Sequence, residues 1–353
     1  MAGLVNYLFN TLSAAIFGTE AGEEEETMPT AYYDCDRYTP STEDVLSVKD
    51  VLCKEFKLPL ELVDSIIDFA EYWPRTTTCR TGGELHVRSG RSIENQFMLR
   101  SYPLGYIPNE DAPTICPMIS TGNHEFPVMP AQPYNLNADI LQHDNREEVF
   151  SRWTEASQIR GEHACRKIVF TIVSHDQGWG GSSADRGTYR GSYTWFDVGK
   201  ETIHTCEDTS VVNRMNRDAF PVLLPRHGAP VEFEGNVPLA CTVETTVPTV
   251  NSSSPDRFEH PLMPTMKSLQ KNLTATRQSQ EHKITWSFQD NIMNPDSVAG
   301  TDLESQGRGS ETANGAFVKD MKVGDIVTVW AKARFPGWVN IVESVKIDVY
   351  YAV

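Results

Sequence analysis

From Thr76 onward the chain is a succession of short β-prone stretches separated by Gly, Pro, Asn and Asp, and helical periodicity largely disappears. Stretches rich in β-branched and aromatic residues with turn residues between them predict strands. The predicted strands are residues 85–88, 168–174, 192–198, 231–233, 240–245, 282–288, 326–334 and 342–351. Many short strands joined by turns and long Pro-rich loops predict a mainly β fold, an antiparallel β-sandwich of jelly-roll type over residues 76–353.

Two helices are expected before this region, as a small hairpin within residues 28–75. Acidic residues follow Ser41, as in the first turn of a helix, and Pro59 suits the start of a second helix. Apolar residues then recur at spacings of three and four, first Val45, Val48, Leu52 and Phe56, and later Leu62, Ile66, Phe69 and Trp73. This spacing predicts one apolar face on each helix. A further helix is predicted at residues 146–157.

The first 27 residues form a separate segment. Residues 4–17, from Leu4 to Phe17, are apolar, but no Lys or Arg precedes them and the run is too short to span a bilayer. Such a segment folds back on its own domain, or it docks on a protein partner or a membrane surface. An acidic run at residues 20–26 predicts a solvated linker.

Charge and cysteine content narrow the class of protein. The formal net charge is −17, and no Lys/Arg cluster offsets it, so no nucleic-acid partner is expected. Seven scattered cysteines without a C-x-x-C pair are typical of a reducing compartment, and we expect a cytoplasmic protein. None of the nine histidines lies at ligand spacing from another His or Cys, so the sequence predicts no metal and no cofactor.

The densest group of chemically versatile residues follows the strand at 168–174. Imidazole, carboxylate, amide and indole groups occur there among glycines, which give the backbone conformational freedom. The residues selected as ligand-binding candidates are His175, Asp176, Gln177, Trp179, Tyr189, Arg190 and Trp195. Such a loop suits a polar ligand with an apolar face, such as a sugar, or a peptide. A structural interpretation stays open, in which the indoles fill the core and the polar groups bind loop backbone.

A second stretch, at residues 323–340, combines a strand with the turn Phe-Pro-Gly-Trp. Arg334 would supply a planar cation, Trp338 a stacking face and Asn340 an amide. If both Trp-containing loops lie at one end of the sandwich, they form one site. The alternative is that Arg334 pairs with nearby carboxylates while Trp338 closes the core.

No catalytic residue is predicted. Ser174, His175 and Asp176 are consecutive, and side chains alternate in direction along a strand, so they cannot form the hydrogen-bonded chain of a hydrolase triad. The chain contains no G-x-S-x-G motif. An enzyme is therefore the third hypothesis.

Residues 174–180 (SHDQGWG), 189–196 (YRGSYTWF) and 330–338 (WAKARFPGW) resemble a group of filamentous-fungal proteins, over roughly residues 55–353. This resemblance implies a β-sandwich and no particular activity. Residues 58–67 (LPLELVDSII) also resemble the start of an F-box, which would imply a ubiquitin-ligase adaptor. The later F-box helices have no counterpart, because β-prone sequence follows Trp73.

Taken together, the sequence predicts a non-enzymatic recognition module that binds a carbohydrate, a small polar ligand or a peptide through its Trp- and Gly-rich end loops. Two alternatives remain, a structural or assembly protein that docks through residues 4–17, and the ubiquitin-ligase adaptor.

Overall fold

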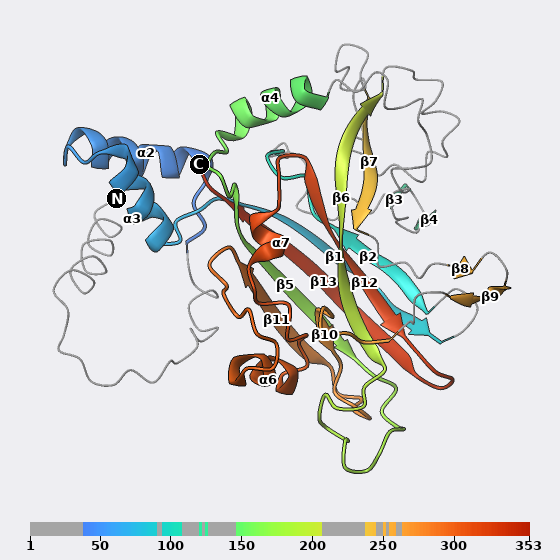
Figure 1. The fold of residues 1–353 in the computed structure, drawn as a ribbon. Coiled ribbons are helices and arrows are strands. Elements are labelled where there is room, and N and C mark those ends of the chain that lie inside the picture. Colours follow the sequence, from blue (N-terminus) through green and yellow to red (C-terminus); the bar gives the residue numbers. More distant parts are fainter. Residues whose placement is uncertain are drawn as a thin grey trace, which may run out of the picture. The chain divides into compact units, whose positions relative to one another are not determined.

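The computed structural model describes residues 38–89, 94–107, 120–121, 124–125, 146–206, 237–244, 250–251, 254–258 and 263–353 (Figure 1). Two compact units are present, Met1–Arg75 together with Ala352–Val353, and Thr76–Tyr351. The apolar segment at residues 4–17, the expected strand at 231–233 and most of the Pro-rich loops lie outside the described residues.

The first unit contains α2 (Thr42–Lys54) and α3 (Leu60–Phe69), at the positions where two helices are predicted. A capping box starts α2, since the Ser41 hydroxyl accepts from the Asp44 backbone N–H and the Asp44 carboxylate accepts from that of Ser41. Lys49 of α2 donates to the Asp64 carboxylate of α3 at 2.7 Å and also to the backbone oxygen of Val353. This lysine therefore links the two helices to the last residues of the chain.

The buried face of α3 differs from the expected one. Val63 and Ile67 are buried, whereas Leu62 is 53% exposed and Phe69 63% exposed. Successive residues lie about 100° apart around a helix. The residues that face the core are therefore shifted by one position from the predicted ones, and the predicted apolar face is turned toward the surface. The helix also ends at Phe69, and Trp73 is buried beyond it, with its indole N–H donating to Asp68 at 2.8 Å.

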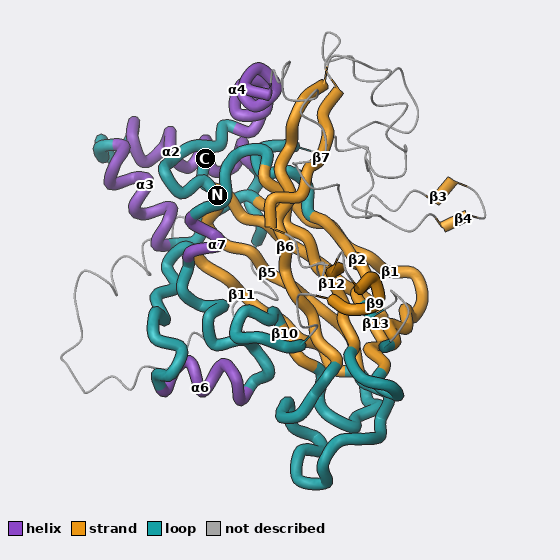
Figure 2. The backbone as a smooth tube through the Cα atoms, turned by 45° about the vertical axis from the view of Figure 1, so that its right-hand side comes forward, coloured by secondary structure: helices purple, strands orange, loops and turns teal. Residues whose placement is uncertain are grey.

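The second unit is mainly β and is built on two antiparallel sheets, consistent with a β-sandwich (Figures 1 and 2). The first sheet has the order β1 (Arg75–Arg88), β13 (Val339–Tyr351), β5 (Cys165–His175) and β11 (Gln280–Ser287). The second has the order β10 (Gln270–Lys271), β6 (Thr194–Cys206), β12 (Asp325–Ala333) and β2 (Asn95–Arg100), with β7 (Val237–Glu244) paired to β6. Two short pairs complete the strands, β3 (Ser120–Thr121) with β4 (His124–Glu125) and β8 (Val250–Asn251) with β9 (Ser254–Phe258).

The core follows the two-residue period of the strands. On β5, Ile168, Phe170 and Ile172 are buried, and their neighbours on the adjacent strands include buried Ile284 and Val345. Every residue of β12 is buried. The polar residues of this strand, Asp325, Thr328 and Lys332, are therefore buried together with its β-branched and aromatic residues.

Other elements were not predicted. The chain enters β1 at Arg75, ten positions before the expected strand start at 85, and β2, α6 (Val298–Ser305) and α7 (Ala316–Lys319) were missed. The predicted helix at 146–157 is confirmed as α4 (Arg146–Ser157), while residues 263–280 are mostly loop with the two-residue β10. Within the described part of the chain, none of the helices combines the length and the apolar character needed to cross a membrane.

A buried polar network joins the two sheets at the end of the second unit where β5 ends and β13 begins. Asn272, which follows β10, donates to Asn340 of β13 at 2.9 Å and to Thr194 of β6 at 3.1 Å, and it accepts from Ser174 of β5 at 2.7 Å. Asn340 in turn donates to the backbone oxygens of Trp195 and Lys332 at 3.0 and 3.2 Å. Both asparagines are fully buried, so the network fixes the spacing of the sheets there.

We expect Asn272→Ala to lower the free energy of unfolding by about 2–4 kcal/mol, because it removes three hydrogen bonds and leaves buried partners unpaired. Urea denaturation of parent and variant measures this change. Asn291→Ala, at an exposed position, is the matched control and should stay within about 0.5 kcal/mol of the parent. Equal stability of the two variants would contradict a structural role for the network.

Candidate functional site

Three loops meet at one end of the second unit, the lower end in Figure 1, and we call them the end loops: residues 176–193, 272–279 and 334–338 (Figures 1 and 2). Asp176 joins the first two. Its carboxylate accepts from the backbone N–H of Gly178, Ala275 and Thr276 at 2.7, 2.5 and 2.8 Å, and its side chain is fully buried. One carboxylate thus joins two loops that are about 100 residues apart in the sequence.

The charge state of Asp176 reflects two opposing effects. Burial raises the pKa of its carboxyl group above the usual range, and the three backbone N–H donors act in the opposite direction. With its oxygens committed to backbone, this carboxyl group serves as an anchor of the loops.

Gln177 connects the first end loop to the third. Its side-chain oxygen accepts from the backbone N–H of Val339 at 3.0 Å, and its amide donates to the backbone oxygen of Trp179. The same side chain therefore fixes the backbone that carries Trp179 and the strand that follows Trp338. Both loop stretches singled out in the sequence are held at the same end of the fold.

Four aromatic side chains gather on this scaffold, and we call them the aromatic rim: Trp179, Tyr193, Phe335 and Trp338. The ring of Tyr193 lies edge-on to Phe335 at 4.7 Å and to Trp338 at 5.3 Å between centroids. Trp179 lies 56% exposed and Phe335 41% exposed, so two faces of the rim are open to solvent. Edge-to-face contacts of this kind stabilise an aromatic cluster by about 0.5–1.5 kcal/mol per pair.

Gly337 sets the position of Trp179. Its backbone has φ +92°, and a Cβ atom there would lie 2.8 Å from the outer edge of the Trp179 ring. Only glycine allows both this backbone conformation and this close approach. The indole is therefore held against the β12–β13 turn, with the rest of its surface exposed.

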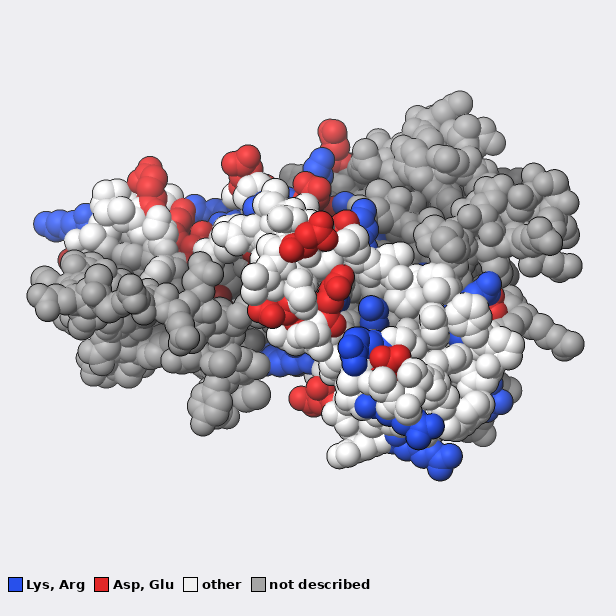
Figure 3. All heavy atoms as spheres, turned by 60° about the horizontal axis from the view of Figure 1, so that its bottom comes forward, with Lys and Arg blue, Asp and Glu red and all other residues white. Residues whose placement is uncertain are grey.

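Basic side chains lie on the end loops, and Figure 3 shows several Lys and Arg side chains, with acidic ones among them, on the face turned toward the viewer. The guanidinium group of Arg334 lies 5.6 Å from the Phe335 ring centre and 3.8 Å from Glu94. Arg277 lies across Gly178 and donates to the Gln177 backbone oxygen at 3.3 Å. Arg190 lies 3.6 Å from Asp185, and Arg186 is exposed nearby.

The structure separates the residues predicted for this site into two groups. Trp179, Arg190, Arg334 and Trp338 reach the surface of the end loops, and the Trp179 ring lies against Gly337, the residue before Trp338. Asp176, Gln177, Trp195 and Asn340 are buried, and they build the scaffold. Trp195 is a core residue of β6, with its indole N–H on Asp197 at 3.2 Å, so we leave these four out of the proposed binding surface.

The other two residues predicted for the site, Tyr189 and His175, lie outside the aromatic rim. Tyr189 is half-buried against His282, with 5.9 Å between ring centroids, and His175 lies at the partly exposed end of β5. The prediction missed Tyr193, Phe335 and Arg277. The first two stand inside the motifs that were noticed, but nothing in their local pattern distinguishes a rim position from a core position.

Comparison of the chain with protein-family models, with curated proteins and with solved structures gave no significant match. The resemblances to filamentous-fungal proteins and to an F-box therefore stay predictions, and the site has to be interpreted from its own geometry.

We expect Gly337→Ala to displace Trp179, because the added methyl group meets the indole ring. Iodide quenching of tryptophan fluorescence should increase as the ring leaves the turn. Gly187→Ala is the matched control, since this glycine has a similar backbone conformation, φ +71°, with no atom within 4 Å of a Cβ. Both variants should lose about 1 kcal/mol of stability from backbone strain. Quenching that is the same in both would contradict the placement of Trp179.

A second prediction concerns pH. His282 of β11 is buried under Tyr189, and burial lowers the pKa of its imidazole from 6.5 to about 4. Between these values the unfolded chain binds a proton that the folded chain does not, so stability should fall as the pH is lowered from about 6.5 to about 4.

The free energy of unfolding should fall less on acidification in His282→Phe than in the parent, by about 2–3 kcal/mol, because the variant has no imidazole at this position to protonate. Urea denaturation of both proteins at pH 7 and at pH 4.5 measures it. A loss of the same size in parent and variant would mean that other groups cause the pH dependence.

Proposed function

We propose that the protein is a non-enzymatic recognition module, a β-sandwich of jelly-roll type, that binds an acidic carbohydrate on the aromatic rim of its end loops. One observation supports this most strongly: Trp179 is 56% exposed although its backbone is fixed by Gln177 and its ring by Gly337. A large apolar ring that is held in place and left open to solvent is a feature of binding surfaces.

The shape of the rim favours a ligand with a flat apolar face. Sugar rings present such a face, and an indole ring buries it without losing much conformational freedom of its own. Tyr193 contacts both Phe335 and Trp338 edge to face, so the surface beside Trp179 is already formed. A preformed surface avoids the entropic cost of ordering side chains on binding.

The charge of the end loops favours an acidic ligand. The whole chain carries a formal charge of −17, yet Arg186, Arg190, Arg277 and Arg334 lie on the end loops. Arg190 and Arg334 have carboxylate neighbours, whereas among the described residues Arg186 and Arg277 form no ion pair. A guanidinium group binds a carboxylate through two parallel hydrogen bonds, which suits a sugar acid.

The cysteines support a cytoplasmic location, which we propose as well. Cys53 and Cys165 are free thiols in the described part of the chain. Free cysteines are typical of proteins kept in a reducing compartment.

A second candidate function is docking on a protein partner through α3. Its residues Leu62 and Phe69 are 53% and 63% exposed, which is unusual for two large apolar side chains on one short helix. This surface belongs to the first compact unit and the aromatic rim to the second, so the two functions are compatible.

Binding should be measured by calorimetry with oligosaccharides of glucuronic acid and with neutral glucose oligosaccharides of the same length. We expect the acidic ligand to bind more tightly and Trp179→Ala to weaken it by about 2 kcal/mol, a factor of roughly 30. Met293→Ala, which removes another exposed apolar side chain, 79% exposed, is the control and should bind as the parent does.

Three results would decide against the proposal. Binding of neither oligosaccharide would remove the carbohydrate function. Equal binding by Trp179→Ala and the parent would remove the rim. Tight binding of an acidic peptide in place of the sugar would assign the rim to peptide recognition.

A further inference from the structure

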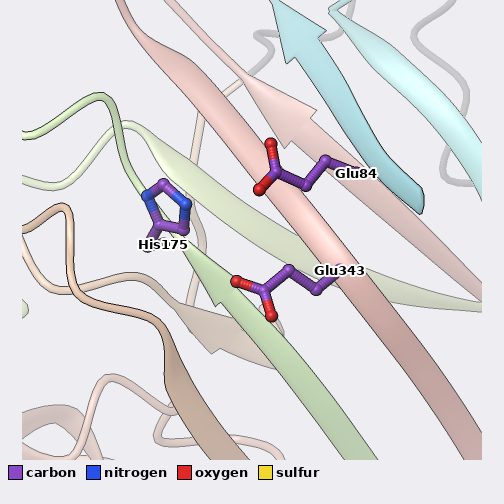
Figure 4. A group of neighbouring side chains, drawn as sticks. All are labelled: Glu84, His175 and Glu343. Carbon is purple, nitrogen blue, oxygen red and sulfur yellow. The ribbon is translucent and has the colours of Figure 1, made fainter.

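Three potential metal ligands converge on one face of the first sheet, outside the aromatic rim. Glu84 comes from β1, His175 from the end of β5 and Glu343 from β13, and the sheet order places β13 between the other two strands. A carboxylate oxygen of each glutamate and a ring nitrogen of the histidine all lie within 4.8 Å of one another. Figure 4 shows both carboxylates extending toward the imidazole ring.

A β-bulge brings Glu343 to this position. Val342 pairs with Ser174 and Ser344 with Val173, so Glu343 is an extra residue between two register pairs. Val342 and Val345 are buried, while Glu343 and Ser344 are both partly exposed, so the bulge keeps Glu343 on the outer face. Bulges commonly redirect a side chain toward a functional site. Ile341 lies directly opposite His175, which places Glu343 close to the imidazole.

The ring of His175 is oriented for metal binding. Its Nδ1 lies 2.7 Å from the backbone oxygen of Asp176, an acceptor, so Nδ1 carries the proton in the neutral ring. The other nitrogen, Nε2, then has a free lone pair. Histidines that bind metals are oriented in this way, with one ring N–H donating to a backbone oxygen or a carboxylate.

The two carboxylates lack a permanent positive partner. Glu84 lies 3.3 Å from the His86 ring, and Glu343 accepts from the Ser279 hydroxyl. Within the described residues, neither is in an ion pair with a lysine or arginine. Like charges on neighbouring strands repel, and a cation bound between them removes this repulsion.

We propose that Glu84, His175 and Glu343 bind one divalent transition-metal ion of the Zn²⁺ or Mn²⁺ type. The ligand set combines two carboxylates with one imidazole, which favours these ions over Ca²⁺, whose ligands are oxygens. Bonds of about 2.0–2.2 Å bring ligand atoms within about 4.3 Å of each other. Small rotations of the exposed Glu84 and the partly exposed Glu343 side chains would close the remaining gap, and water would fill the other positions.

The ion would cross-link three strands whose residues are far apart in the sequence. It would also fix the end of β5, from which the first end loop begins. The inference goes beyond the proposed function, because it requires neither the aromatic rim nor a carbohydrate.

The test is calorimetric titration of the full chain, in metal-free buffer with a reducing agent, with ZnCl₂, MnCl₂ and CaCl₂ in turn. We expect one Zn²⁺ or Mn²⁺ ion per chain and much weaker binding of Ca²⁺. Glu84→Gln, His175→Gln and Glu343→Gln should each weaken binding about tenfold or more. Glu281→Gln changes the same charge at an exposed position on the neighbouring strand β11 and is the matched control. Its affinity should equal that of the parent.

A second measurement does not depend on the variants. Nitrogen NMR of the histidine rings in the parent protein should show the Nε2 signal of one histidine shifting on addition of Zn²⁺, and this signal should be absent from the spectrum of His175→Gln. Absence of binding, binding that all three variants retain, or a shift that involves only other histidines would each overturn the proposal. Zn²⁺ binding that disappears on alkylation of the cysteines and persists in the three variants would assign the ion to thiols.

Discussion

The hydrogen bond between the side chains of Asn272 and Asn340, 2.9 Å long and fully buried, determines how the two sheets meet at the end of the second unit that carries the end loops. An amide that is buried with all its partners present is satisfied at only one spacing of the surrounding strands. Ser174, Thr194 and the backbone of Trp195 complete the network, so strands from both sheets share it. The loops beyond this point start from fixed positions.

Buried side-chain hydrogen bonds also fix the end loops. Asp176 joins two of them through backbone N–H groups, and Gln177 joins the first to β13. These polar side chains were predicted to bind a ligand, but they form hydrogen bonds with the loop backbone. The loops are thereby fixed, while the Trp179 side chain stays exposed. A rigid aromatic surface among arginines, in a chain that is acidic as a whole, is the basis of the proposed function.

The same strand ends offer two different surfaces. His175 ends β5 on the outer face of the first sheet, and the next residue, Asp176, turns inward to hold the end loops. The alternation of side chains along a strand separates a group with metal-binding chemistry from a group with a structural role. The β-bulge at Glu343 supports this division, because it keeps a carboxylate outside while Val342 stays in the core.

The sequence by itself determined the elements whose signals are local. The turn-punctuated β-prone stretches, the capped α2 and the helix at Arg146–Ser157 follow from propensity, capping and periodicity within a few residues. It also indicated both Trp-containing loops.

Only the tertiary structure decided which side chains face solvent, because burial depends on strands that pair across long stretches of chain. Trp179 and Trp195 look equivalent in the sequence, yet the first is 56% exposed and the second fully buried. Glu84, His175 and Glu343 share no local spacing, and only the sheet order β1-β13-β5 and a one-residue bulge bring them together.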